Sequence, residues 1–363
     1  MAKTTTTVIG GVDTHKHTHY AAAIDHHGRL LGHQEFPAKA SGYEALHDWL
    51  QSLGEVQRIG VESTGNFGAG LMRFLVGAGE VVVEVNKPNH QARRMEGKSD
   101  RLDAEQIARS VLADVGTATP KSKSGPVEVI RTLRVARASA VRSRTQAFNN
   151  LFHTMISAPS EIRDDLVGLT KRTFVNACLI LEPETDDLLK LIDEPERLVV
   201  ASIKLTLRDL ARRWKALDAE AKVLSGQIAA LVDHTAPELV GLFGVSSELA
   251  AQFLMTAGDN AERIRNEAAF AKLCGVSPKP ASSGRTNGRH RLNRGGDRSA
   301  NSALYIVTIV RLRHHQPTKD YVARRTAEGL SKREIIRCLK RYIAREVFAA
   351  LPRSPAEALP LAA

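Results

Sequence analysis

Four carboxylates in the first third of the chain are spaced so that they could act together on a phosphodiester. Asp13 ends the β-rich stretch TTTTVIGGVD, and Glu62 follows the short apolar run RIGV. Asp100 and Asp103 stand three residues apart in KSDRLDAEQIA, so a helix beginning there carries both on one face. Carboxylates from two strand ends and one helix can hold two Mg²⁺ ions roughly 4 Å apart, which activate the attacking oxygen and stabilise the leaving one.

The four acids differ in how well an ordinary structural role explains them. Aspartates in the first turn of a helix are common surface residues because the helix dipole favours them, and this alone would account for Asp100 and Asp103. An acid that ends an apolar strand is costly to bury without a partner or a metal. Asp13 and Glu62 are therefore the stronger candidates.

The residues beside Asp13 offer other ligands, namely His15, Lys16, His17 and His19. We interpret them as solvated or phosphate-facing, with metal ligation as the alternative. The cysteines, Cys178, Cys274 and Cys338, lack the spacing of a zinc site, and they predict core residues in a reducing compartment. Oxygen-only ligation favours magnesium.

The densest basic stretch lies far from these acids, in SPKPASSGRTNGRHRLNRGGDRSANSALY. Between residues 279 and 298 it has one acid, Asp297, and six cations: Lys279, Arg285, Arg289, Arg291, Arg294 and Arg298. Its glycines (Gly284, Gly288, Gly295 and Gly296) permit close approach to a phosphate chain. A solvated basic loop is the alternative, but the density of cations favours a nucleic-acid contact.

Two serines, Ser282 and Ser283, lie inside this basic stretch. A serine hydroxyl becomes a nucleophile when it is deprotonated, and nearby guanidinium groups can stabilise both its alkoxide and the charge on phosphorus. Serines in glycine-rich loops usually form turns. Composition alone therefore leaves a catalytic role open and does not separate Ser282 from Ser283.

Elements of an α/β domain must position the acids. Paired strands are predicted at residues 4–36, and short buried strands at 58–64 and 81–86. Helices are predicted at 41–54, 67–79 and 99–116, with Ser41 and Ser99 as N-caps. This domain is expected to span residues 1–120 and to end at the Pro-, Gly- and Lys-rich linker PKSKSGP.

The rest of the chain is predicted to be helical, with a coiled-coil region at 126–235, a mainly α domain at 236–352 and a disordered tail at 353–363. Spacings of four and three alternate through one apolar series, Ile203, Leu207, Leu210, Trp214, Leu217, Ala221, Leu224, Ile228 and Leu231. This is typical of a coiled-coil seam. The Arg-rich helix expected at 128–155 is either its partner within the chain or part of a dimer.

Composition places the chain among globular proteins that bind polyanions. It is 43% hydrophobic, with 51 Lys and Arg against 40 Asp and Glu, a formal charge of +11 and a pI near 9.7. Such an excess of cations favours nucleic acid, because each cation on a phosphate releases counterions. No apolar run is long enough to cross a membrane, and no signal peptide is recognisable. We expect a cytoplasmic, nucleoid-associated protein.

Four strings together resemble one family: GVDTHKHTHYAAAID, GVESTGNF, NKPNHQARRMEGKSDRLDAEQIA and LCGVSPKPASSGRTNGRHRLNRGGDRSANSALY. In order and spacing they resemble the DEDD insertion-sequence transposases, which are related to Piv-type DNA invertases and known as bridge-RNA-guided recombinases. The similarity covers nearly the whole chain.

The resemblance implies an RNase H-like (RuvC-like) N-terminal domain, a coiled-coil connector and a mainly α C-terminal transposase domain. Its D-E-D-D set falls on Asp13, Glu62, Asp100 and Asp103, which would bind magnesium. Its serine nucleophile, which immediately precedes a glycine, falls on Ser283 and would form a phosphoserine intermediate with DNA.

The resemblance also implies partners. These are donor DNA, target DNA and a structured guide (bridge) RNA that pairs with both, and sequence choice would then rest on base pairing. It implies a catalytic site composed from two protomers, in dimers that pair into a tetramer. One departure is LFGV at 242–245, where the family often has a Pro-Gly-Ile-Gly hairpin. Standard helix-hairpin-helix contact with the DNA backbone is therefore not expected there.

Two other functions fit parts of the same pattern. A metal-dependent nuclease of the Holliday-junction resolvase kind would use the acids, with Ser283 only binding phosphate. A basic DNA- or RNA-binding protein with a degenerate nuclease fold would need neither the acids nor Ser283. The intact set of four acids disfavours this function.

Overall fold

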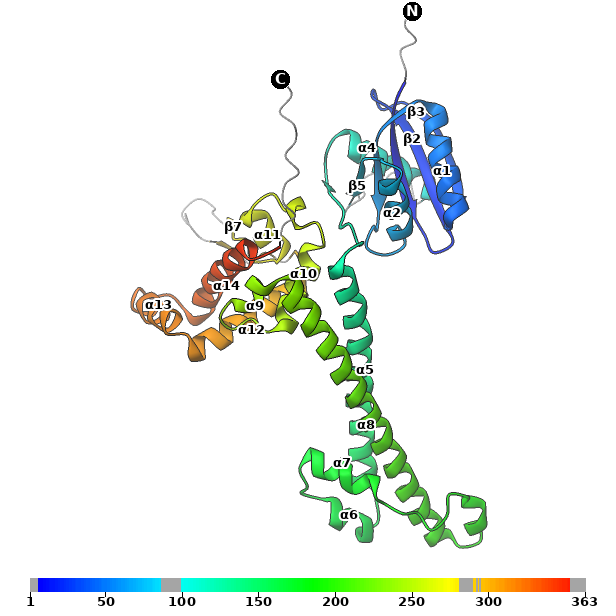
Figure 1. Ribbon diagram of the computed structural model, residues 1–363, viewed down its shortest axis with the longest axis vertical. Helices are drawn as coiled ribbons and strands as arrows, with labels where there is room; N and C mark the ends of the chain where they lie inside the picture. The colour runs from blue at the N-terminus through cyan, green and yellow to red at the C-terminus, as the bar shows by residue number, and fades with distance from the viewer. Residues whose placement is uncertain (1–5, 86–98, 281–289, 292, 294, 353–363) are drawn as a thin grey trace, which may run out of the picture. The chain divides into compact units, whose positions relative to one another are not determined.

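The computed structural model describes residues 6–85, 99–280, 290–291, 293 and 295–352 (Figure 1). The chain divides into two compact units. Unit 1 comprises residues 1–127, 256–301 and 351–363, and unit 2 comprises 128–255 and 302–350. The expected tail at 353–363 lies outside the described residues.

Unit 1 is built on a six-stranded mixed sheet in the order β3-β2-β1-β4-β5-β6. Its strands are β1 Thr7–Thr14, β2 Thr18–Asp25, β3 Leu30–Pro37, β4 Glu55–Glu62, β5 Val82–Val85 and β6 Thr117–Ala118. β1 pairs in parallel with β4, and β4 with β5, whereas the other neighbouring pairs are antiparallel. The described part of the N-terminal region is thus α/β, as the sequence predicted.

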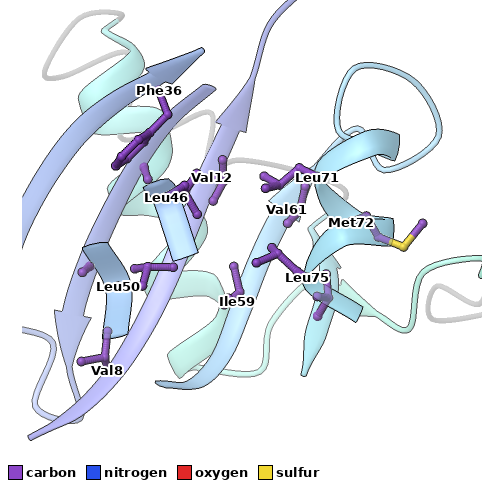
Figure 2. Packing of buried hydrophobic residues seen from close by; sticks show 13 residues of the cluster. Val8, Val12, Phe36, Leu46, Leu50, Ile59, Val61, Leu71, Met72 and Leu75 are labelled. Carbon is purple, nitrogen blue, oxygen red and sulfur yellow. The ribbon is translucent and has the colours of Figure 1, made fainter. Parts of the chain in front are cut away.

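Helices cover both faces of this sheet because its central strands are apolar on both sides. Their bounds are α1 Ala40–Leu53, α2 Ala69–Gly77 and α4 Asp100–Leu112. Neighbouring strand residues point to opposite faces: Val8 packs with the α1 and α2 side chains, whereas Ile9 packs with those of α4. Figure 2 shows the first cluster, in which Leu46, Leu50 and Leu71 lie over the strands.

One of the two predicted N-caps is confirmed. Ser99 caps α4, since its side chain accepts a hydrogen bond from the Leu102 N–H at 3.3 Å. The expected cap at Ser41 is wrong. α1 already begins at Ala40, after Lys39, so Ser41 lies inside the first turn.

Two long helices run antiparallel in unit 2, α5 Pro126–Ile156 and α8 Pro195–Thr235. Arg137 Nε donates to Ser225 Oγ at 2.6 Å, and Arg144 forms an ion pair with Asp218. From the first contact to the second, the residue number rises by seven on α5 and falls by seven on α8, as expected for antiparallel helices. The helix α5 is therefore a partner of α8 within the chain. All nine residues of the expected seam on α8 are buried or half-buried.

Shorter helices complete unit 2 and the second segment of unit 1. Between the long helices lie α6 Ser160–Leu166, α7 Lys171–Leu179 and η1 Leu188–Leu191. The apolar side chains of α6 and α7 join those of α5 and α8 in one core. After α8 follow α9 Pro237–Gly241, α10 Ser247–Ala257, η2 Ala261–Arg263, α11 Glu267–Leu273, β7 Lys279–Pro280, β8 His290–Arg291, α12 Arg298–His314, α13 Gln316–Ala327 and α14 Lys332–Ala349. None of the helices described is both long and apolar enough to cross a membrane.

Candidate active site

The sheet brings the first two acids together at one edge. β1 and β4 are parallel neighbours with Val12 opposite Val61, so Asp13 and Glu62 both come at the carboxyl ends of adjacent strands. In α/β folds, ligands commonly bind beyond the carboxyl ends of parallel strands, which is where these two side chains lie. The Thr14 hydroxyl donates to the backbone oxygen of Glu62 at 3.0 Å and ties the two strand ends to each other.

The first turn of α4 supplies the other two acids. Asp100 is exposed, whereas Asp103 is only 2% exposed. The helix lies directly on β1 because Gly11 has no side chain. A Cβ there would be 2.3 Å from both Ala104 O and Ala108 N, which is too close for any side chain. This contact holds the first turn of α4 against the strand that carries Asp13.

Asp13 is the centre of the acidic group. It is 6% exposed, and burial, the largest cause, raises its pKa above the usual 3.8. The charges of Asp103 and Asp100 raise this pKa further. A side-chain hydrogen bond with Glu62 lowers it, as does the charge of His15. All three other predicted acids thus interact with Asp13, and the structure brings the four together.

His15 belongs to the same group. Its Nε2 lies 3.3 Å from Asp13 Oδ2 and 3.4 Å from Asp100 Oδ1. One ligand atom from each of these three residues lies within 4.8 Å of the others, an arrangement that could hold a metal ion. This geometry favours metal ligation, the alternative that the sequence left open for His15, while 44% of its side chain remains exposed. The ring lies among the carboxylates because the strand ends at Thr14 and the chain turns there.

The other basic residues beside Asp13 separate into two kinds. Lys16 and His17 are exposed, in agreement with a solvated position. His19 is fully buried and stacks on Tyr43 at 5.6 Å, so the solvated interpretation is wrong for this residue. Burial lowers its pKa, which favours the neutral ring.

The acidic group suits a hard cation. A buried carboxylate among like charges is unfavourable unless a cation or a proton compensates it. The donors are mainly carboxylate oxygens, which divalent ions such as Mg²⁺ and Mn²⁺ prefer, with one imidazole nitrogen at the edge. The residues present therefore fit a divalent metal, and they offer ligands from two strands and a helix.

The basic segment is described only at its ends. Lys279 in β7 pairs with Arg291 in β8, and Lys279 is exposed. Arg298 is exposed at the start of α12. The remaining predicted residues lie outside those that the structure describes, namely Ser282, Ser283, Arg285, Arg289 and Arg294.

Asp297 and Gly296 anchor the far end of this segment. Asp297 Oδ1 accepts hydrogen bonds from the Ser299 and Ala300 N–H groups at 2.8 and 3.1 Å, and its Oδ2 accepts one from the Thr256 hydroxyl at 2.7 Å. Gly296 has φ +98°, and a Cβ on it would be 2.6 Å from Leu273 O. The packing of its neighbours therefore requires a glycine at this position, because protein backbone occupies the space that a side chain would need.

Sequence reasoning did not identify Gly11 or Thr14 as parts of the site. The glycine pair at 10 and 11 inside a strand was a usable signal, because glycine in a strand interior often marks close approach of another backbone. Thr14 gave no such signal, since its role follows from the register of β1 and β4.

Two family models match the chain. Residues 10–157 match a family described as a transposase with a DEDD domain, and residues 237–323 match one described as the transposase IS116/IS110/IS902 family. The first match contains all four acids and His15, and the second contains the basic segment with Ser283.

Two curated relatives come from Streptomyces. The chain is 25% identical, over 375 aligned positions, to the insertion element IS116 uncharacterized 44.8 kDa protein of Streptomyces clavuligerus, covering 91% of each chain. It is 26% identical over 170 positions to the insertion element IS110 uncharacterized 43.6 kDa protein of Streptomyces coelicolor, covering 46% of this chain and 42% of the relative.

Proposed function

Because the chain belongs to the IS110/IS116 family of insertion-element transposases, we propose that its acidic group and Ser283 act on the same phosphodiester. In this proposal the protein is a DNA recombinase that cuts and rejoins strands through a phosphoserine intermediate. The observation that carries it is the meeting of Glu62, Asp100 and Asp103 around the buried Asp13.

Asp13, Glu62, Asp100 and Asp103 would hold Mg²⁺ in an RNase H-like (RuvC-like) domain. The metal, when bound, supplies Lewis acidity to the phosphate and its leaving oxygen. The chain's own part is to fix the ligands. The β1–β4 register sets Asp13 beside Glu62, and the close contact of Gly11 with α4 keeps Asp103 near Asp13.

Ser283 would supply the nucleophile. Its Oγ attacks the phosphorus and forms an O–P bond, the bond from phosphorus to the leaving DNA oxygen breaks, and the serine proton is passed to the medium or to a base. The released DNA end leaves as a hydroxyl. A DNA hydroxyl from the other duplex then attacks the phosphoserine, which rejoins the DNA and returns the serine. The cations of the basic segment, including Lys279 and Arg298, favour the negatively charged states of both steps.

The partners follow from the same family resemblance. Donor and target DNA are the substrates, and a structured guide (bridge) RNA selects them by base pairing. The acidic group of one protomer would meet Ser283 of another, in dimers that assemble into a tetramer. The net charge of +11 supports contacts with nucleic acid, and the exposed Lys279 and Arg298 lie in the segment expected to make them.

Trapping the covalent intermediate tests this proposal. The protein is incubated with Mg²⁺, end-labelled donor and target DNA, and RNA transcribed from the element's flanks, and protein–DNA adducts are resolved on denaturing gels. Ser283→Ala should abolish both the adduct and strand exchange, whereas the neighbouring Ser282→Ala should retain them. Asp103→Asn should abolish cleavage but leave DNA binding intact.

Each failure has a distinct meaning. Cleavage by Ser283→Ala without an adduct would replace this proposal with a resolvase-like nuclease. Cleavage by Asp103→Asn would remove the acidic group from the chemistry. Strand exchange that is unchanged when the RNA is omitted or digested would overturn the guided mechanism and leave the serine mechanism standing.

A further inference from the structure

The C-terminal helices of unit 2 form an open cavity of about 170 Å³ that the recombination chemistry does not use. Residues of α12, α13 and α14, and of the short turn between α12 and α13, line it. All of them fall between residues 308 and 346, apart in sequence from the acids and from the 279–298 segment. Figure 1 shows these three helices in orange and red, one after another.

The floor of the cavity is polar and firmly held. Arg311 is 5% exposed and forms two hydrogen bonds with the carboxylate of Glu346, at 3.0 and 2.7 Å. Its Nε also donates to Phe243 O at 2.9 Å. A buried arginine with these partners fixes α12 to α14, and its bidentate geometry leaves little freedom. The cavity is therefore preformed and does not depend on closure around a ligand.

The walls are aromatic. Tyr321 and Tyr342 meet edge to face with their centroids 5.7 Å apart, and Tyr342 is 45% exposed. Arg345 lies 5.9 Å from the centroid of Tyr342, and Arg324 lies 5.5 Å from that of Tyr321. His315 lines the same cavity and lies against Phe243, with the ring centroids 4.8 Å apart and the ring planes tilted by 35°. Each tyrosine thus combines a flat surface with an adjacent cation.

The surrounding surface is strongly basic. Residues 316–349 contain nine Lys and Arg against four Asp and Glu. One of these acids, Glu346, is paired with Arg311 on the cavity floor, and another, Glu334, caps α14 together with Ser331. This excess of cations around an aromatic cavity favours an anionic ligand that also has flat rings.

We propose that this cavity takes one unstacked base of a single-stranded nucleic acid, which stacks on Tyr342, while the adjoining phosphates lie along the cations of α13 and α14. Aromatic side chains beside cations are the usual means of binding single strands, because every base has a flat face and every linkage a charge. A duplex is a poor ligand by comparison, since its base faces are already stacked.

This inference rests on the proposed function only in that the chain handles nucleic acid. It requires neither Ser283 nor the acidic group, and it adds a second contact that reads an unpaired nucleotide. DNA and RNA share the recognised chemistry, and the source of the strand is decided by experiment. An unpaired strand arises both in a structured RNA and in duplex DNA opened for strand exchange.

The test is binding of labelled 15-nucleotide strands to the full-length protein in EDTA, followed by fluorescence anisotropy. Tyr342→Leu should weaken the binding of single strands by about 5- to 150-fold, the range expected for the loss of one stacked base. Tyr342→Phe keeps the ring and should bind as wild type does. Tyr305→Leu is the matched control, because Tyr305 is similarly exposed (47%) but is not part of the cavity lining.

A second readout reports stacking directly. 2-Aminopurine placed at successive positions of the strand should lose fluorescence at one position when it is bound to wild type, and Tyr342→Leu should restore the signal. DNA, RNA and duplex of one sequence are compared, and circular dichroism checks that each variant is folded. An equal loss of single-strand and duplex binding in Tyr342→Leu would overturn the inference. So would unchanged anisotropy and quenching in a folded Tyr342→Leu.

Failure here is distinguishable from failure of the proposed function. The stacking signal at Tyr342 is measured in EDTA, without cleavage, so it is read whether or not Ser283 is the nucleophile. Conversely, the adduct experiment tests the role of Ser283 whether or not a base stacks on Tyr342.

Discussion

Replacing Gly11 by alanine should separate α4 from the sheet and disperse the acidic group. Gly11 does not have a positive φ, so alanine is compatible with its backbone and the only obstacle is space. The new Cβ would be 2.3 Å from two backbone atoms of α4 and 2.9 Å from a third. Reaching 3.0 Å, below which Cβ contacts essentially never occur, requires the helix or strand to move by at least about 0.7 Å.

This movement has two measurable consequences. Overpacking of a closely packed interior costs typically about 1–3 kcal/mol of unfolding free energy. Asp100 and Asp103 move with the first turn of α4, away from Asp13. Misplacement of a catalytic group by about 1 Å can lower the rate by about 100-fold. We therefore expect both weaker Mn²⁺ binding and slower DNA cleavage.

Gly10→Ala is the matched control. The neighbouring residue points to the opposite face, where its Cβ would meet the end of the Leu50 side chain at 3.2 Å and Ile59 Cγ2 at 3.4 Å. Side-chain ends can shift by a few tenths of an ångström, so this variant should bind metal nearly as wild type does. Calorimetric titration with Mn²⁺, chemical denaturation and the cleavage assay compare the two. If Gly11→Ala matches Gly10→Ala in all three, the account of how α4 is positioned is refuted.

Three further predictions concern stability. Burial and like charges hold the pKa of Asp13 above 3.8, so its contribution to the stability of the fold is fully present below pH 3.8 and is lost as the pH rises through the raised pKa. Asp13→Asn should therefore have a higher melting temperature than wild type at pH 7 in EDTA, and the difference should shrink as the pH falls toward 3.8. A lower melting temperature of the variant at pH 7 would contradict this. Leu207→Ala should cost about 2–5 kcal/mol by urea denaturation because Leu207 is fully buried, whereas Val223→Ala (62% exposed) should cost under about 0.5. Glu346→Gln should cost about 1.5–3 kcal/mol in the same assay by weakening the hydrogen bonds to buried Arg311, and an unchanged midpoint would show that this pair does not secure α14.

Sequence periodicity was sufficient for most of the elements. Val8 and Ile9 pack on opposite faces of the sheet, and strands buried on both sides give the nearly continuous apolar runs that were recognised. The seam from Ile203 to Leu231 also predicted a long helix, because spacings of three and four follow from the helical repeat alone. The pairing of α5 with α8 was left open, since it depends on contacts such as that of Arg144 with Asp218.

The candidate site was predicted in its members but not in its geometry. Asp13 and Glu62 were identified by their positions at strand ends, and the parallel register places them side by side. Nothing local shows that His15 lies between two carboxylates, because this depends on where α4 crosses β1. The packing role of Gly296 was missed for a similar reason. A glycine in a loop can serve a ligand or a neighbouring backbone, and only the packing distinguishes these.

Unit 1 is completed by a segment that is synthesised long after its sheet. The backbone N–H of Val127 donates to Asp259 Oδ1 at 2.7 Å, and that of Ser122 donates to Asn260 Oδ1 at 3.1 Å. Asn260 in turn donates to Pro120 O at 3.0 Å. On the ribosome, these three hydrogen bonds of the segment 119–127 cannot form until more than a hundred further residues have been made. A truncated product that ends within α8 would lack all three, so the unit that carries the acids is fully hydrogen-bonded only after the chain has extended past Asn260.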